Sequence, residues 1–276
     1  MLALPEIDPR AIPGLSEIAI CPPCGLALEG RTHCRACGIE YPEVDGILHA
    51  LGTLRGTNRV AASFYDGPNW AGFKPWEQLF LWFQGPGIDR ARRQVLRHLP
   101  QTHNAKVLEV GIGDGENVRL LPLSWSLYGV DIARTRLESC RDRFPEMSGR
   151  LAWAEAEALP FADGEFDAVF TVGGFNYFRD HAAALAEMRR VARPGAPLIV
   201  ADELPDLYRL APGHVLGLEG LDRLGLQIMG LEPDFVSMVL DHRVEVEALV
   251  RAEWPGHRRY PIWNRLGYCL VDVVVS

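Results

Sequence analysis

Three glycines at alternating positions form the stretch of this sequence best suited to hold a ligand. The apolar run 107–110 contains Glu109, and Gly111, Gly113 and Gly115 follow it. This order predicts a strand, a tight turn and the N-terminus of a helix. Glycines leave space for a ligand against the backbone, and the unpaired N–H groups of the helix would face that ligand. We therefore expect a nucleotide or similar cofactor at this turn.

Four of the six cysteines form two close pairs, which is the spacing of a metal site. Cys21 and Cys24 make the first C-x-x-C pair, and Cys34 and Cys37 make the second after nine intervening residues. Each pair turns the chain so that both thiolates reach one ion, as in a four-cysteine zinc ribbon. A redox dithiol is the alternative, which a thioredoxin-like βαβ pattern would favour. We predict a structural zinc site in residues 1–53.

An acidic residue after the next predicted strand adds a second ligand contact. The run 127–130 ends at Asp131, twenty residues beyond Gly111. A carboxylate there can accept hydrogen bonds from ribose hydroxyls, although the position also suits a helix N-cap before Ala133. A dinucleotide fingerprint would need a third glycine at position 116, which is Glu116. The pattern is instead E-x-G-x-G-x-G.

This pattern resembles motif I of the class I S-adenosylmethionine-dependent methyltransferases. Residues 154–167 look like the G-D-A-E-x-L-P-F-x-D-x-S-F-D signature of type 11 methyltransferases, and the run 166–196 matches that family without a gap. The F-Y-D element at 64–66 resembles one found before motif I in menaquinone-biosynthesis-like methyltransferases. The residues that the resemblance places at S-adenosylmethionine are Glu109, Gly111, Gly113, Gly115, Asp131, Ile132, Glu155, Ala156, Thr171 and Tyr65. Glu155 would accept from the adenine amino group, and the Ala156 N–H would address a ring nitrogen.

The alternation of predicted strands and helices from Lys106 onward indicates an α/β fold with a mostly parallel sheet. The resemblance implies a Rossmann-like, seven-stranded class I methyltransferase sheet over residues 101–276, and the run 266–275 fits its antiparallel last strand. The long segment 204–254 is predicted to form a substrate-pocket insertion.

Residues 54–100 are predicted to be a helical connection or lid. Phe73, Trp76, Phe80 and Phe83 share one helix face, which is either plain core or a cover for the substrate. Four arginines follow on a helix over 88–99, where we expect a solvated face: Arg90, Arg92, Arg93 and Arg97.

The end of the fourth strand faces the transferable methyl group in this fold. Asn176 and Tyr177 lie there, where relatives often carry histidines, and are our first candidates for contacting the acceptor. His181 is a conceivable general base, but an exposed histidine in a first helical turn is the simpler interpretation.

Charge and composition favour a small-molecule acceptor. The chain has 28 basic and 36 acidic residues, a net charge of −8, which disfavours an extended nucleic-acid surface. Apolar runs of membrane-spanning length and a signal-peptide pattern are missing, so we expect a cytoplasmic protein without a membrane partner. The sequence leaves the oligomeric state open.

Two other functions stay open. The stretch 38–48 resembles zinc-ribbon segments fused ahead of bacterial methyltransferases and the zinc-ribbon activator subunits of transfer-RNA methyltransferases. A ribosomal RNA methyltransferase is one alternative, because guanine-modifying enzymes of that kind also join an N-terminal zinc site to this fold. Residues 1–60 are slightly acidic, however, which favours a module that packs on the catalytic domain or a partner. A cofactor-binding partner subunit without its own chemistry is the other.

Overall fold

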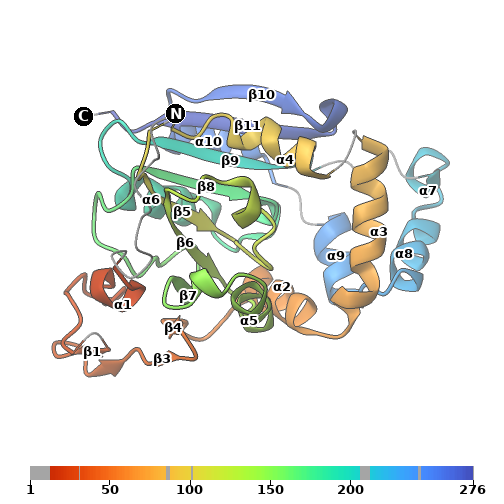
Figure 1. Cartoon of the computed structure of the whole chain (residues 1–276). Helices are drawn as coiled ribbons and strands as arrows, with labels where there is room; N and C mark the ends of the chain where they lie inside the picture. The colour runs from red at the N-terminus through yellow and green to blue at the C-terminus, as the bar shows by residue number, and fades with distance from the viewer. Residues whose placement is uncertain are drawn as a thin grey trace.

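A computed structural model describes residues 13–30, 32–84, 88–100, 102–205, 212–241 and 244–275. Within these ranges one sheet forms the centre of the molecule (Figure 1). Its strands are β3 (Glu43–Val44), β4 (Ile47–His49), β5 (Lys106–Val110), β6 (Ser126–Asp131), β7 (Leu151–Trp153), β8 (Ala168–Val172), β9 (Pro197–Glu203), β10 (Arg258–Ile262) and β11 (Gly267–Val273). They lie in the order β10-β11-β9-β8-β5-β6-β7-β4-β3.

The seven strands from β5 to β11 reproduce the predicted mostly parallel sheet. Strands β5 to β9 pair in parallel. Strand β11 pairs antiparallel with both β9 and β10, as predicted for the last strand. Because the carboxyl ends of the parallel strands meet at one edge, the residues that follow β5, β6 and β8 are brought together there.

The N-terminal segment extends this sheet by two strands that the sequence did not predict. Strand β4 pairs in parallel with β7, with Ile47 opposite Leu151. Strand β3 pairs antiparallel with β4 and forms the outer edge. A strand added to β7 satisfies backbone groups that an exposed edge would leave unpaired. The N-terminal segment is therefore part of the same sheet as the glycine turn.

Helices cover both faces of the sheet. They are α1 (Leu15–Ile18), α2 (Gly56–Asp66), α3 (Asn69–Gln84), α4 (Ile88–Leu96), α5 (Arg134–Arg143), α6 (His181–Val191), α7 (Pro212–Val215), α8 (Glu219–Ile228), α9 (Pro233–Asp241) and α10 (Val246–Glu253). Buried side chains of α6 and α10 join one core, and those of α4 and α5 join the core on the opposite face. Apolar burial on both sides explains why the central strands read as continuous hydrophobic runs.

A third core lies at the carboxyl end of the strands and is built largely from aromatic residues of α2, α3 and α9. Phe64, Trp70 and Phe235 are buried in it, and Tyr177 packs against them. Figure 1 shows these helices grouped beyond one end of the sheet. Phe73 of the predicted aromatic face packs here too, whereas Trp76 is 49% exposed. The side chains of Phe80 and Phe83 lie outside the described part of the structure.

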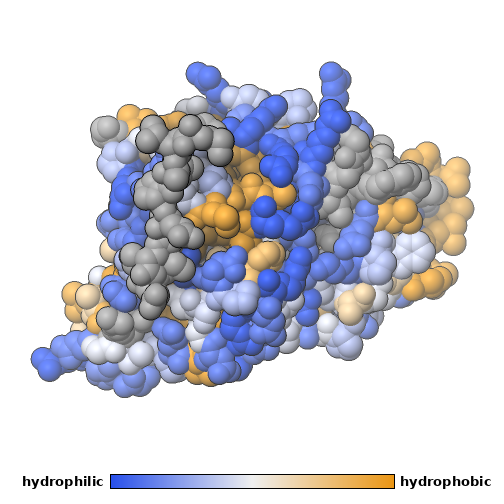
Figure 2. All heavy atoms as spheres, in the orientation of Figure 1, coloured by the Kyte–Doolittle hydropathy of each residue, from blue (hydrophilic) through white to orange (hydrophobic). Residues whose placement is uncertain are grey.

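The helix pair α7 and α8 carries an exposed apolar surface. Figure 2 shows hydrophobic side chains at the end of the molecule where these helices lie. Its members are Val215, Leu216, Leu218, Leu221, Leu224 and Ile228, each more than half exposed. Among the described residues, each helix is too short or too polar to cross a membrane.

The predicted helix after the glycine turn does not form, which corrects the sequence-based interpretation. Residues 118–120 make only a 3-10 turn, η2 (Val118–Leu120). Pro122 lies two residues after the end of this turn, and β6 begins four residues later at Ser126. This segment is too short for an α-helix. A helix dipole therefore does not act at this turn. Carboxylates and individual backbone groups must hold the ligand instead.

Candidate active site

A pocket opens at the carboxyl end of the sheet, between the strand ends and α2 and α3. It encloses about 1220 Å³ of empty space, its open mouth included. Predicted cofactor residues that line it are Tyr65, Glu109, Gly111, Gly113, Asp131, Ile132 and Ala156.

The three glycines of the turn have different roles. All adopt left-handed backbone conformations, with φ of 75° at Gly111, 53° at Gly113 and 76° at Gly115. A Cβ on Gly113 would meet no atom within 4 Å, because this residue faces the pocket. A Cβ on Gly115 would lie 2.6 Å from Cys140 Sγ. Gly115 thus allows α5 to pack close to the turn.

Asp131 connects the glycine turn to the next helix. Its Oδ2 accepts a hydrogen bond from the Gly113 N–H at 2.8 Å, and its Oδ1 accepts one from the Ala133 N–H at 2.8 Å. Burial raises the pKa of Asp131 to about 6, while these two N–H groups act in the opposite direction. Each carboxylate oxygen can accept a further bond. The ribose role and the cap role predicted from sequence are therefore geometrically compatible.

Glu109 presents an unsatisfied carboxylate oxygen in the wall of the pocket. It is 1% exposed, and its Oε1 accepts a 2.6 Å bond from the Asn117 amide. Its Oε2 is buried without a hydrogen-bond partner in the described structure. Burial raises the pKa of Glu109 to about 8. A cationic group of a ligand, such as the ammonium group of S-adenosylmethionine, would donate a hydrogen bond to this oxygen and stabilise the ionised form of Glu109.

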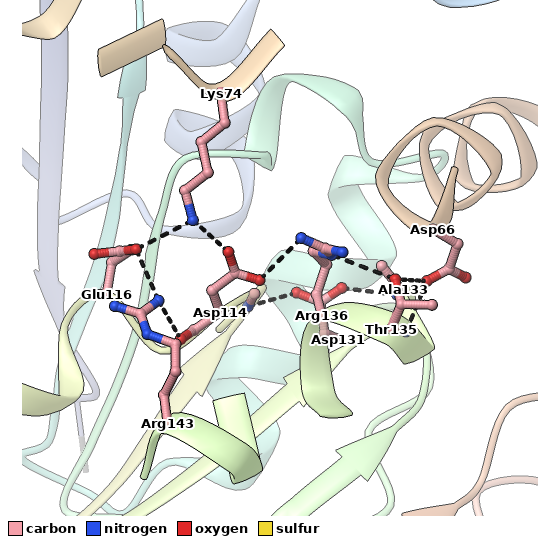
Figure 3. Close-up of polar contacts among 10 residues, drawn as sticks. Asp66, Lys74, Asp114, Glu116, Asp131, Ala133, Thr135, Arg136 and Arg143 are labelled. Atoms are coloured by element: carbon pink, nitrogen blue, oxygen red, sulfur yellow. Dashed lines mark hydrogen bonds and ion pairs between the residues drawn. The ribbon is translucent and has the colours of Figure 1, made fainter. Parts of the chain in front are cut away.

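Charged side chains from α3 and α5 meet at the carboxylates of Asp114 and Glu116 in the glycine turn, as Figure 3 shows. Lys74 of α3 bonds Asp114 Oδ2 at 2.5 Å and lies 3.4 Å from Glu116 Oε1. Arg136 and Arg143 of α5 reach the same two carboxylates from the other side. These contacts hold α3 across the glycine turn.

Two cationic residues of this region were not identified from the sequence. Lys74 and Arg92 both line the pocket. Arg92 donates to Asn117 Oδ1 at 3.1 Å, so the expectation of a fully solvated arginine face on α4 is wrong at this position. The sequence offered one signal, because Lys74 is a single lysine among aromatic residues. Only the tertiary fold brings it opposite Asp114.

The predicted adenine loop is held by a side chain from α2. Asn58 is 2% exposed and donates to Glu155 Oε1 at 3.0 Å and to both oxygens of Glu157. Asn58, Ala156 and Glu157 line the pocket, whereas Glu155 is turned toward Asn58. Glu187 of α6 braces the same loop by accepting from the Leu159 N–H at 2.8 Å.

The three residues predicted at the acceptor side separate into one at the pocket, Tyr177, and two within the fold, Asn176 and His181; Thr171, predicted at the cofactor, also lies within the fold. Asn176 donates to the Glu203 carbonyl and accepts from the Tyr268 hydroxyl, both at 2.9 Å. Thr171 is fully buried, with its hydroxyl 3.5 Å from the Gly173 carbonyl.

His181 is not the exposed residue that we expected. It is 7% exposed, and its ring packs edge-on against Phe175 with centroids 5.0 Å apart. The first turn of α6 is buried because this helix packs directly on the sheet. Asp180 caps the helix by accepting from the Ala183 N–H.

The four N-terminal cysteines converge on one point. Their Sγ atoms all lie within 4.8 Å of one another. The N–H groups of Gly25 and Gly38 close the two turns by donating to the carbonyls of Cys21 and Cys34, at 2.8 and 2.7 Å. Both glycines have positive φ, as expected for tight turns after a ligand. Tetrahedral coordination with Zn–S bonds of about 2.3 Å places sulfurs slightly less than 4 Å apart, so this cluster fits one zinc ion.

Comparisons with known proteins agree with the site. A family model described as a methyltransferase domain matches residues 108–200. An O-methyltransferase of Penicillium expansum is 29% identical over 124 residues, 43% of this chain and 45% of that protein. A demethylmenaquinone methyltransferase of Thermotoga maritima is 31% identical over 133 residues, 47% of this chain and 57% of that protein. The chain thus spans about half the length of these curated relatives.

Solved structures resemble the chain more loosely. An S-adenosylmethionine-dependent methyltransferase from Aquifex aeolicus is 14% identical, with a TM-score of 0.48 over 80% of this chain and 100% of that chain. A phosphoethanolamine N-methyltransferase from Haemonchus contortus, solved with S-adenosyl-L-methionine, is also 14% identical, with a TM-score of 0.48 over 81% of this chain and 61% of that chain.

The domain match and the strand order define the class of protein. Strands β5 to β11 are arranged as a mostly parallel sheet with one antiparallel strand inserted beside the edge. The matched residues 108–200 contain the glycine turn, Asp131 and the loop after β7. The chain therefore carries a class I S-adenosylmethionine-dependent methyltransferase domain.

Proposed function

We propose that this protein is an enzyme that transfers a methyl group from S-adenosylmethionine to a small-molecule acceptor. One observation carries the proposal: a single pocket joins the glycine turn and Asp131 to aromatic side chains of α2 and α3. A pocket covered by helices suits a small acceptor better than a nucleic-acid strand, which needs an open basic track. The names of the two curated relatives, an O-methyltransferase and a demethylmenaquinone methyltransferase, support an acceptor of this kind.

The cofactor would be held mainly by carboxylates and backbone groups. We assign Asp131 to the ribose hydroxyls and Glu109 to the ammonium group of the methionine part, because each has free acceptor capacity at the pocket. The Ala156 N–H would address the adenine ring, whereas Glu155, which was also predicted to do so, is turned toward Asn58 and does not line the pocket. The remaining proposed contacts shape or line the site: Tyr65, Gly111, Gly113, Gly115, Ile132 and Thr171.

The chemistry requires little from the protein beyond alignment and proton removal. When bound, S-adenosylmethionine supplies a methyl group on a sulfonium that is already reactive. The protein must hold the acceptor atom in line with this methyl group. We propose Tyr177 as the acceptor-side contact, because its ring lines the pocket while Asn176 and His181 are engaged in the fold.

Binding and turnover measured separately test this function. We expect the purified protein to bind S-adenosylhomocysteine by calorimetry and to release it from S-adenosylmethionine with a small acceptor at a rate that changes little with salt. Binding without turnover of any acceptor would favour a non-catalytic subunit. Affinity for ribosomal RNA that falls steeply with salt would favour the RNA methyltransferase.

We also propose that the four-cysteine cluster binds a structural zinc ion. The knuckle geometry supports this site, and the module that carries it is joined to the catalytic sheet through the β4–β7 pairing. Four free thiols held for a metal are typical of a reducing compartment, which supports a cytoplasmic location.

Metal analysis should return about one zinc ion per chain, since one tetrahedral site is available. Cys34→Ser should lose most of this zinc and melt at a lower temperature, because metal binding contributes directly to the folding of such modules. Cys269→Ala is the matched control, since Cys269 is buried in the catalytic sheet away from the cluster. Zinc retained at the original level in Cys34→Ser would contradict the assignment.

A further inference from the structure

Tyr177 lines the acceptor side of the pocket, and Glu203 lies behind it at hydrogen-bond distance. The Tyr177 hydroxyl donates to Glu203 Oε1 at 3.0 Å. Tyr177 belongs to the turn η4 (Phe175–Tyr177) that follows β8, and Glu203 is the last residue of β9. The two strands are neighbours in the sheet, so the pair spans the strand ends where the transferable methyl group would lie.

Two carboxyl groups, those of Asp202 and Glu203, lie next to each other at the end of β9. Asp202 is fully buried and accepts from the N–H groups of Asn176 and Glu203. Burial, and then the charge of Glu203, raise the pKa of Asp202 well above its usual range. The side chain of Glu203 faces the Tyr177 hydroxyl instead.

The position of the pair is fixed from both sides. The Glu203 carbonyl accepts from the Asn176 amide, and Asn176 accepts from the Tyr268 hydroxyl of β11. The Tyr177 ring packs against Phe235 of α9, with centroids 5.5 Å apart. Burial and the nearby charge of Glu203 raise the pKa of Tyr177 well above 10, so Tyr177 holds its proton until a reaction moves it.

Aromatic rings form the other walls of this part of the pocket. Tyr65 and Trp70 line it and pack edge to face, with centroids 4.9 Å apart. Trp70 is 9% exposed, and its Nε1 has no hydrogen-bond partner in the described structure. Flat aromatic walls with an unsatisfied N–H donor suit a planar ring that carries oxygen.

We propose that the acceptor is a small aromatic hydroxyl compound and that Tyr177 relays its proton to Glu203, the general base. This inference rests on the proposed function. The acceptor oxygen forms a bond to the methyl carbon while the carbon–sulfur bond breaks and leaves its electron pair on sulfur. The hydroxyl proton passes to the Tyr177 oxygen, and the Tyr177 proton passes to Glu203. The products are the methyl ether, a neutral thioether and a protonated Glu203.

Two phenols of different acidity test the relay. At pH 8 4-nitrophenol is already ionised, whereas 4-ethylphenol still carries its proton. A general base typically contributes about 10²–10⁴-fold. Glu203→Gln and Tyr177→Phe should therefore lower kcat for 4-ethylphenol on the order of 100-fold. Both variants should retain most of their kcat for 4-nitrophenol.

Structural damage has a different signature from loss of the relay. It would lower kcat equally for both phenols, and that result would overturn the proposed base. Glu247→Gln, at an exposed position on α10, is the matched control and should leave both rates unchanged. S-adenosylhomocysteine affinity, measured by calorimetry, should stay within about twofold in all three variants, because none removes a proposed cofactor contact.

The wild-type protein distinguishes this inference from the proposed function. Methyl ether formed from both phenols supports the aromatic hydroxyl class. The protein could instead bind S-adenosylhomocysteine and methylate 4-ethylaniline or 4-ethylthiophenol, but neither phenol. That result would overturn the acceptor class and leave the methyltransferase function standing. Failure to bind S-adenosylhomocysteine would instead remove the proposed function itself.

Discussion

Asp131→Ala is expected to weaken S-adenosylhomocysteine binding about 100-fold, the equivalent of two tenfold steps of about 1.4 kcal/mol each. The variant would lose the proposed carboxylate contacts to both ribose hydroxyls. It would also release the N–H groups of Gly113 and Ala133, which Asp131 now holds at 2.8 Å. The glycine turn would then be less well ordered before the ligand arrives. Isothermal titration calorimetry measures the change directly.

Two further variants separate these contributions. Asp131→Asn keeps the side-chain shape and one acceptor oxygen but removes the charge, so we expect a loss of about tenfold. Asp142→Ala, on the exposed surface of α5, should bind like the wild type. Unchanged affinity in Asp131→Ala would refute the ribose assignment.

The affinity for S-adenosylhomocysteine should rise with pH between about 6 and 7, by up to tenfold per unit. Burial raises the pKa of Glu109 to about 8 in the free protein, so this carboxyl is mostly protonated over that range. The ligand ammonium favours the ionised form, and binding must therefore release a proton. Asp131, with a pKa of about 6, adds a smaller proton release near the lower end of this window.

Glu109→Gln provides the control for this pH dependence. Its neutral amide cannot release a proton, so the slope should disappear near pH 7, where only a small contribution of Asp131 remains, and the affinity at pH 7 should be lower. Calorimetry at pH 7 in buffers of different ionisation enthalpy counts the released proton. The same slope in wild type and Glu109→Gln would show that Glu109 does not sense the ligand.

The raised pKa of Glu109 also has a consequence for stability. The folded-state pKa of about 8 lies above the ordinary value of 4.5. Its contribution to stability is therefore fully present at low pH and is lost as pH rises toward 8. Bound ligand would oppose this loss by favouring the ionised carboxyl.

The sequence by itself predicted the mostly parallel sheet and the glycine turn that lines the pocket. The apolar runs at β5, β6, β8 and β9 are recognisable because both sheet faces are buried, so each strand is hydrophobic throughout. Gly111, Gly113 and Asp131 are local signals, since a positive φ and an acidic strand end are properties of single positions. The paired cysteines are similarly local, because each knuckle is closed within a few residues.

Only the tertiary structure decided what covers the pocket and how its parts are connected. Lys74 meets Asp114, Asn58 meets Glu155, and Tyr177 meets Glu203 across sequence separations that no local pattern encodes. The addition of β4 to β7 depends on an unpaired strand edge that exists only after the sheet has formed. The missing helix after Gly115 and the burial of His181 likewise follow from chain length between strands and from packing on the sheet. Periodicity cannot report either of these constraints.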